Sequence, residues 1–160
     1  MRKLKSFRSE RKNSLLNWYR VKNPLIVALN FVLIYPARYM PSLRVKNFLY
    51  RLTGMKVGHD VAVGLGAVFD IFFPELIEIG DNCIIGYGVT VLAHEFLHEE
   101  WRTGRVKIGR NVLIGANSTI LAGVSIGDNS KVSACSLVND DIPANSFYAG
   151  VPARKVKGVR

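Results

Sequence analysis

Apolar residues recur at every sixth position through most of the chain after residue 56. The repeat is interrupted twice, and from Ile108 to Val138 it runs through six hexads without losing phase. If about a quarter of positions carry Ile or Val, six matches at six preset positions have a chance on the order of one in several thousand. The apolar positions are Val57, Val63, Phe69, Ile79, Ile85, Val91, Ile108, Ile114, Ile120, Ile126, Val132 and Val138.

Two other columns of the repeat indicate how the backbone turns. The second position of each hexad is usually glycine or another small residue, and the fourth collects Asn, Asp and Gly, which tolerate the left-handed backbone region. A corner every six residues predicts a triangular coil of parallel strands, three hexads to a turn, with the apolar positions stacked inside. An ordinary sandwich would not keep this phase. The fourth-position residues are Asp60, Gly66, Asn82, Gly88, Asn111, Asn117, Gly123, Asn129 and Asp141.

The charge of the chain divides it into two unlike parts. The net charge is +10, but residues 1–53 hold 12 Lys and Arg against the single acid Glu10, whereas residues 54–160 hold 10 against 11 acids. We therefore expect a basic extension over 1–53 and an all-β solenoid domain over 54–157. Because no groove-reading motif accompanies the charge, a nucleic-acid arm is the least favoured explanation of the extension.

The extension is expected to be helical and amphipathic. An apolar run from Leu25 to Tyr35 lies between two prolines and is shorter than the roughly 20 residues that span a bilayer. Residues 42–52 place apolar side chains at helical spacing with Arg and Lys between them. Two interpretations stay open: the helices lie on an anionic membrane face, or their apolar faces pack on the protein or on a neighbouring subunit. The N-terminus does not match a signal peptide, so we expect a cytoplasmic protein, peripheral to the inner membrane face under the first interpretation.

The end of the chain adds a family resemblance to this pattern. The hexads, with Asp141-Ile-Pro-Ala-Asn and the terminal Ala149-Gly-Val-Pro-Ala-Arg, resemble the hexapeptide-repeat acyltransferases, especially the maltose and galactoside O-acetyltransferases. The resemblance covers about residues 55–157 and implies a left-handed parallel β-helix. It also implies a homotrimer with active sites between subunits, acetyl-CoA as co-substrate and no metal. The extension differs from that of the sugar enzymes.

The two interruptions of the repeat are the places where chemistry is expected. The first, residues 69–78, carries aromatic residues around Asp70, and the second is a polar external loop over 94–107. His94 occupies the corner column, where a purely structural turn gives no reason for histidine. Acyl transfer to a hydroxyl needs a base that ionises near neutral pH, and imidazole fits this requirement. The sugar acetyltransferases carry a histidine at the matching place, so His94 is the expected general base.

The remaining site residues are expected from position and resemblance. Asp70 is assigned to catalysis or to acceptor binding, because it can orient His94 or hold an acceptor hydroxyl; a solvated turn carboxylate is the alternative. The expected acceptor-binding set is Asp70, Glu75, His98 and Arg102. By analogy with the family, small residues admit the pantetheine arm of coenzyme A and cations bind its phosphates. These positions are Gly86, Ala116, Ala122, Ala134, Arg154 and Lys157.

Two other function classes remain open from the sequence. A metalloenzyme like the γ-class carbonic anhydrases would use three histidines across a subunit interface, and the chain has His59, His94 and His98. Ligands on successive coils would be about six residues apart, whereas His94 and His98 are four apart. A non-catalytic trimeric scaffold is the third class, and it gives no reason for His94. The leading hypothesis is an acetyl-CoA-dependent O-acetyltransferase acting on a sugar or glycan hydroxyl.

Overall fold

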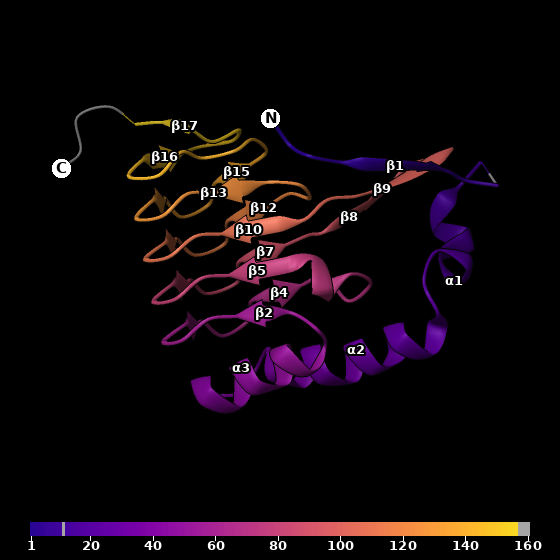
Figure 1. Ribbon diagram of the computed structural model, residues 1–160, viewed down its shortest axis with the longest axis horizontal. Helices are drawn as coiled ribbons and strands as arrows, with labels where there is room; N and C mark the ends of the chain where they lie inside the picture. The colour runs from indigo at the N-terminus through magenta and orange to yellow at the C-terminus, as the bar shows by residue number, and fades with distance from the viewer. Residues whose placement is uncertain (11, 157–160) are drawn as a thin grey trace.

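The computed structural model describes residues 1–10 and 12–156, and most of it is a stack of parallel strands (Figure 1). Three parallel sheets run side by side along this stack. One contains β2 (Lys56–Val57), β5 (Ile77–Ile79), β10 (Val106–Ile108) and β13 (Ser125–Ile126). The second contains β3 (Ala62–Val63), β6 (Ile84–Ile85), β11 (Leu113–Ile114), β14 (Lys131–Val132) and β16 (Phe147–Ala149), with β17 (Arg154–Lys155) antiparallel at its end. The third contains β4 (Val68–Phe69), β7 (Thr90–Val91), β12 (Thr119–Ile120) and β15 (Leu137–Val138).

The sequence repeat and the strand register agree. Consecutive strands such as β2, β3 and β4 belong to three different sheets, so each turn of the chain adds one strand to every sheet. We call one such turn a coil. In the first sheet Val57 pairs with Ile79, Ile79 with Ile108 and Ile108 with Ile126, and all four side chains are buried. The prediction that the apolar positions stack inside an all-β domain is confirmed.

The corner column is confirmed for most of its members, but Asp141 has no positive φ, and in the last coil the positive φ falls at Asn145 instead. Residues with positive φ recur in that column, and Cys135 takes the place of an Asn or Gly with a φ of 57°. His94 was expected at a corner, and this expectation is wrong: it has no positive φ and begins strand β8 (His94–Phe96). The chain leaves the coil there, so the constraint that selects Asn or Gly does not apply. The other positive-φ residues of the column are Asp60, Gly66, Asn82, Gly88, Asn111, Asn117, Gly123 and Asn129.

The extension contains the predicted helices and one strand that the sequence did not predict. Only the second predicted helix is amphipathic, because the helix over residues 24–37 carries apolar side chains on its exposed side as well. After a 3-10 turn η1 (Ser14–Asn17) come α1 (Trp18–Val21), α2 (Pro24–Ala37) and α3 (Leu43–Leu52). Pro24 opens α2, and the side chain of Asn23 accepts a hydrogen bond from the Leu25 N–H. The expectation that the whole extension is helical is wrong, because β1 (Lys5–Arg8) pairs antiparallel with β9 (Glu100–Thr103) of the external loop. That pairing joins segments almost a hundred residues apart, which no local pattern encodes.

Helix α3 lies across the open end of the stack (Figure 1), and its buried residues include the polar Lys46 and Asn47. Along the strands, backbone N–H groups of each coil donate to carbonyls of the next coil, as the Gly64 N–H does to the Ile85 carbonyl. The first coil has no coil before it, so several of its carbonyls receive no hydrogen bond of this kind. Lys46 Nζ donates to the carbonyls of Val63 at 3.0 Å and Gly64 at 3.2 Å. The neighbouring carbonyls are bonded in the same way, by Asn47 to Val61 and by Arg51 to Val57 and Gly58. The polar face of α3 thus satisfies backbone groups that would otherwise lack a partner.

Replacing Lys46 tests this end cover. Its side chain is 1% exposed, so Lys46→Met leaves two buried carbonyls without a donor and should lower the free energy of unfolding by about 1–3 kcal/mol. Burial also lowers the pKa of Lys46, so the folded protein gives up this proton at lower pH than the unfolded chain. The wild type should therefore gain stability relative to Lys46→Met as the pH rises toward 10.5, the ordinary lysine value. Denaturant titrations at several pH values measure both effects, and the exposed Arg44→Met on the same helix is the control, expected to change stability by less than about 0.5 kcal/mol.

Candidate active site

The two interruptions of the repeat meet at Asp70. This residue follows β4, and β4 pairs with β7, which leads into His94. The Asp70 side chain is 0% exposed and both its oxygens are bonded. Oδ1 accepts hydrogen bonds from the Phe72 and Phe73 backbone N–H groups at 2.8 and 3.0 Å, and Oδ2 accepts one from the Ala93 N–H at 2.7 Å. These bonds hold the carboxylate in one position beside the imidazole.

His94 completes the pair through one of its two ring nitrogens. His94 Nδ1 lies 2.5 Å from Asp70 Oδ2, and because an ionised carboxylate only accepts, Nδ1 carries the proton. Nε2 is then the nitrogen left with a free lone pair. The His94 side chain is 14% exposed, so a small molecule can reach the ring.

The ionised state of Asp70 follows from its contacts. Burial alone would raise its pKa, but the hydrogen bond from His94, the charge of His94 and the backbone N–H donors outweigh burial and lower the pKa of the carboxyl below its ordinary value. A carboxylate that is ionised at neutral pH beside Nδ1 both selects the tautomer and stabilises an imidazolium that forms during reaction. The pair therefore has the geometry of a general base with its orienting group.

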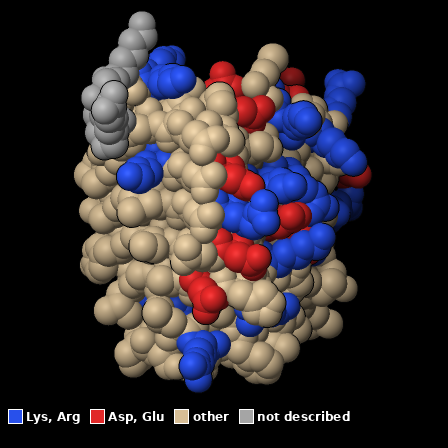
Figure 2. Space-filling view, turned by 60° about the vertical axis from the view of Figure 1, so that its left-hand side comes forward, with Lys and Arg blue, Asp and Glu red and all other residues tan. Residues whose placement is uncertain are grey.

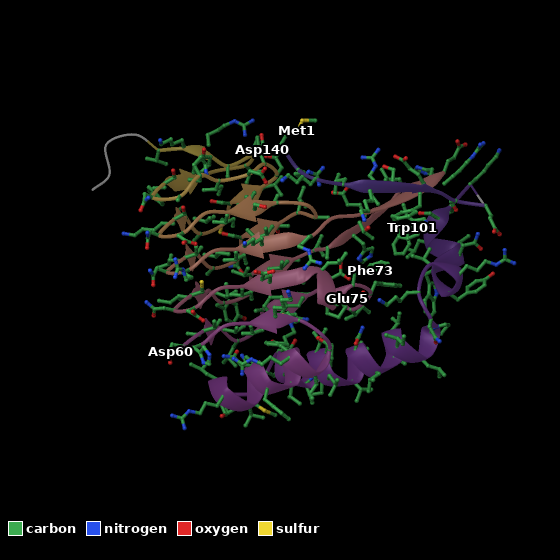
Figure 3. All side chains as sticks on the ribbon, viewed as in Figure 1. Met1, Asp60, Phe73, Glu75, Trp101 and Asp140 are labelled. Atoms are coloured by element: carbon green, nitrogen blue, oxygen red, sulfur yellow. The ribbon has the colours of Figure 1, made fainter. Side chains whose placement is uncertain are left out.

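Aromatic rings surround His94 on the side of the external loop. The ring centroids of Phe72 and Phe96 lie 4.8 Å from that of His94, and Phe73 lies at 5.9 Å. Phe73 stacks on Trp101 (Figure 3). Trp101 stacks in turn on Phe7 of β1. Sequence reasoning noted aromatic residues around Asp70 but missed Phe96, Trp101 and Phe7. The strand register of the external loop, which places these rings near His94, could not be predicted from the sequence.

A groove opens beside this aromatic stack. Its walls carry four cations and no acid, and Trp101 and Phe73 form part of its lining. His94 is not among its lining residues, but its ring lies 5.9 Å from that of Phe73, which is. The lining cations are Lys3, Lys5, Arg105 and Lys107.

The external loop is a β-hairpin, and it separates the predicted acceptor-binding residues. Strands β8 and β9 pair antiparallel, with His94 opposite Thr103 and Glu95 opposite Arg102. Because side chains alternate along a strand, Arg102 points to the face opposite His94, where it pairs with Glu100. His98 lies exposed at the turn of the hairpin. Neither residue is brought to the imidazole.

The other two members of that set have partners of their own. Glu75 lies near Phe73 and is paired with Lys22 Nζ at 2.5 Å (Figure 3). Asp70 has no exposed atom with which to meet an acceptor, so its contacts support the orienting role and not the acceptor-binding one. Of the residues expected at the site, the structure brings His94 and Asp70 together.

Three of the small residues expected to line a coenzyme A groove, Gly86, Ala116 and Ala134, lie at one corner of successive coils. A Cβ added at Gly86 would lie 2.7 Å from the Ala116 nitrogen, and one added at Gly115 would lie 2.3 Å from the Ala134 nitrogen. The coils therefore approach too closely at this corner for a side chain on Gly86. Ala122 lies apart, fully buried after β12, which argues against its role in lining a groove. Arg154 is exposed on β17, and Lys157 lies outside the described residues.

Within residues 1–10 and 12–156, no group of three His, Cys, Asp or Glu side chains is arranged to hold a metal ion. His59 lies exposed in the first coil, while His94 is engaged by Asp70. The three-histidine arrangement considered above is therefore not assembled within the described part of one chain. A site completed by a neighbouring subunit is a separate arrangement, which metal analysis of the purified protein can test.

Comparison with known proteins places this geometry in a family. The model described as "Hexapeptide repeat of succinyl-transferase" matches residues 54–93 and 105–139, leaving out the hairpin. A protein of Bacillus subtilis (strain 168) named "Putative acetyltransferase YvoF" is 50% identical over 143 residues, which are 89% of this chain and 83% of that protein.

Two solved structures share the architecture. A galactoside acetyltransferase in complex with coenzyme A has a TM-score of 0.69 and 27% identity, over 86% of this chain and 82% of that one. A maltose O-acetyltransferase from Clostridium difficile 630 has a TM-score of 0.62 and 22% identity, over 86% and 90% of the two chains, and shows a likeness of fold. The resemblance inferred from the hexads is confirmed, and the chain belongs to the hexapeptide-repeat acyltransferase family.

Proposed function

We propose that the protein transfers the acetyl group of acetyl-CoA to a hydroxyl of a sugar or glycan, with His94 as general base. The observation that carries the proposal is the buried contact between Asp70 Oδ2 and His94 Nδ1, which leaves Nε2 available at a partly exposed ring. The 27% identity to a galactoside acetyltransferase solved with coenzyme A supports both the donor and the sugar acceptor. In keeping with the family, we also propose that the coils wind as a left-handed β-helix.

The reaction follows from the protonation states of the pair. Acetyl-CoA supplies the acyl group as a thioester. His94 Nε2 accepts the proton of the acceptor hydroxyl while the hydroxyl oxygen bonds to the acetyl carbon of the thioester. Asp70 stabilises the imidazolium that this proton transfer creates. The carbon–sulfur bond then breaks, and His94 returns the proton to the departing thiolate. One ester and one thiol form, and His94 ends in its starting state.

Acceptor and donor are proposed to reach His94 from different sides. The aromatic stack of Phe73, Trp101 and Phe7 offers flat apolar surface for a sugar ring, and the adjoining groove is lined with cations. The column of Gly86, Ala116 and Ala134 offers a path close to the backbone for the pantetheine arm, with Arg154 as a cation for phosphate. Small side chains and a terminal cation are the features that such a ligand needs.

A thiol-release assay tests the proposed function directly. Purified full-length protein is given acetyl-CoA with a panel of neutral sugars, amino sugars and acidic sugars, and the product is identified by mass and by its sensitivity to mild base, which cleaves esters but not amides. Acceptor-dependent thiol release with an O-acetyl product is expected. An amide product, or activity that follows bound metal and disappears with a chelator, would contradict the proposal.

A homotrimer with the active site between subunits is part of the proposal, and the outer face of the second sheet supports it. Ile84 and Leu113 lie side by side there and are exposed, and Tyr87 follows on the adjacent corner. Figure 2 shows a broad area without charged side chains beside a band of mixed charge. Such an apolar face on a folded chain is typical of a subunit interface.

Ile84→Asp is expected to convert the trimer into smaller species, because it places a charge between Ala62 and Leu113 on that face. Multi-angle light scattering measures the mass. Lys107→Asp is the control, since Lys107 lies exposed on the outer face of the first sheet, among charged residues. An Ile84→Asp variant with an unchanged mass would show that this face does not join subunits.

A further inference from the structure

Helices α2 and α3 present apolar side chains to solvent on the side away from the coils. In α3 the buried positions are polar, Lys46 and Asn47, together with Tyr50, so the apolar stripe of the amphipathic helix points outward. In α2 the buried stripe is narrow and the opposite side is apolar as well. We call the exposed side chains of the two helices the α2–α3 face. Its members are Leu25, Ile26, Leu29, Phe31, Val32, Tyr35, Val45, Phe48 and Leu52, all exposed.

This arrangement is the reverse of what packing on the chain itself would produce. An amphipathic helix that docks on a core buries its apolar stripe, yet here that stripe is free because the polar side is needed to bond the open carbonyls of the first coil. A continuous exposed apolar face of this kind marks a surface that associates with something else. The partner must accept two helices lying flat along one end of the molecule (Figure 1).

The charge around the α2–α3 face points to an anionic partner. From residue 11 to residue 53 the sequence contains no Asp or Glu. Arg44 is exposed and has no ion pair within residues 1–10 and 12–156, and Arg38 bonds only the neutral Gly66 carbonyl and lies over the Tyr39 ring. At the base of Figure 2, Lys and Arg side chains stand among uncharged ones. A second copy of the same face would bring cations together, whereas an anionic surface would pair with them.

The lengths of the helices favour binding at a membrane surface over crossing the membrane. Among the described residues no helix is long and apolar enough to cross a membrane, and α2 has 14 residues, which is about 21 Å of helix against roughly 30 Å of bilayer core. Tyr35 and Tyr39 are exposed beside Arg38, and tyrosine next to arginine is the pairing found at headgroup depth. A flat apolar face with flanking cations and aromatic rings is the pattern of a helix lying in the interface.

We propose that the α2–α3 face docks the protein on a lipid bilayer that contains anionic phospholipid, with both helices parallel to the membrane plane. Apolar side chains such as Val32 and Phe48 enter the boundary between headgroups and acyl chains, and Arg38 and Arg44 pair with lipid phosphates. Because the face lies at the end of the coils, the cyclic trimer proposed above would present three copies in one plane. Three weak contacts would then act together on a flat surface.

Vesicle flotation of the full-length protein tests the proposal. Vesicles of phosphatidylcholine alone are compared with vesicles containing 30% phosphatidylglycerol, at low salt and at high salt. Binding to the anionic vesicles is expected to exceed binding to neutral ones by about tenfold and to weaken as salt rises. Equal binding to both compositions, or no binding to either, would overturn the proposal.

Matched variants locate the contact. Val32→Ser and Phe48→Ser together should lower binding about tenfold or more, and Arg44→Glu should lower binding to anionic vesicles by a similar factor. Val151→Ser is the control for the first change, since Val32 and Val151 are 62% and 71% exposed, and Lys155→Glu is the control for the second. If the controls weaken binding as much as the face variants do, the docking site lies elsewhere. If Val32→Ser and Phe48→Ser reduce the mass of the oligomer in the absence of lipid, the face is covered by a neighbouring subunit, and the proposal is wrong.

Discussion

Replacing His94 with alanine should lower kcat by about 10²- to 10⁴-fold, because it removes the group that takes the acceptor proton during attack. The KM values for acetyl-CoA and acceptor should change much less, since the binding surfaces proposed above do not depend on the imidazole. The loss should not be recovered at neutral pH by any other side chain, because Asp70, the nearest ionisable group, is fully enclosed. Initial rates of thiol release across a range of acetyl-CoA and acceptor concentrations separate kcat from KM.

Loss of the catalytic base can be distinguished from loss of the folded structure in this experiment. His59→Ala is a matched control, because His59 is exposed in the first coil, and its kcat should stay within about twofold of the wild type. Thermal unfolding of both variants shows whether His94→Ala remains folded. Acetylation at the wild-type rate by a folded His94→Ala protein would remove His94 from the mechanism.

Asp70→Asn is the second change with a large expected effect, a fall in kcat of about 10²- to 10⁴-fold without removal of the base itself. An amide cannot offset the charge of the imidazolium. Its NH₂ group would also face backbone N–H donors that now bond a carboxylate, from Phe72 and Phe73 on one side or Ala93 on the other. The variant should therefore be less stable by about 1–3 kcal/mol as well. Asp60→Asn, at an exposed corner that accepts Asn elsewhere in the column, is the control.

The stability effect of Asp70→Asn has a defined pH dependence. The pKa of Asp70 is lower in the folded protein than its ordinary value of 3.8, so the carboxylate contributes stability that is fully present above that value. The contribution disappears as the pH falls through the lower, folded pKa. Denaturant titrations should accordingly show the wild type and Asp70→Asn approaching each other in stability on acidification below about pH 4. If the difference in stability between the wild type and Asp70→Asn does not change with pH, the contacts of Asp70 do not lower its pKa in the folded protein.

The sequence predicts the coils well because their rules are local and repeat. An apolar residue every sixth position and a corner residue between them place Val57, Ile79 and Ile108 in register without knowledge of the rest of the chain. The same logic located both interruptions, and thus His94 and Asp70, since a residue that breaks a strict pattern is visible against it. His94 was nevertheless placed at a corner, because the pattern does not say where the chain departs from the coil.

The remaining parts depend on contacts between distant segments. Strand β1 forms only because β9 offers an edge, and Lys5 to Arg8 has no strand pattern that would reveal it. The aromatic enclosure of His94 likewise requires the register of the hairpin, which brings Phe96 and Trp101 to the same face. The direction of α3 was unreadable for a similar reason: its apolar stripe would normally face inward, but the first coil needs the donors on its polar side.

The cover that α3 provides also determines how large the molecule can become. A stack of parallel coils ending in bare carbonyls offers the same edge that every internal coil offers, and another molecule could add to it without limit. Lys46, Asn47 and Arg51 use side chains to fill the bonds that a preceding coil would make. Helix α3 therefore acts as a terminator, which keeps the first coil from pairing with strands of another molecule.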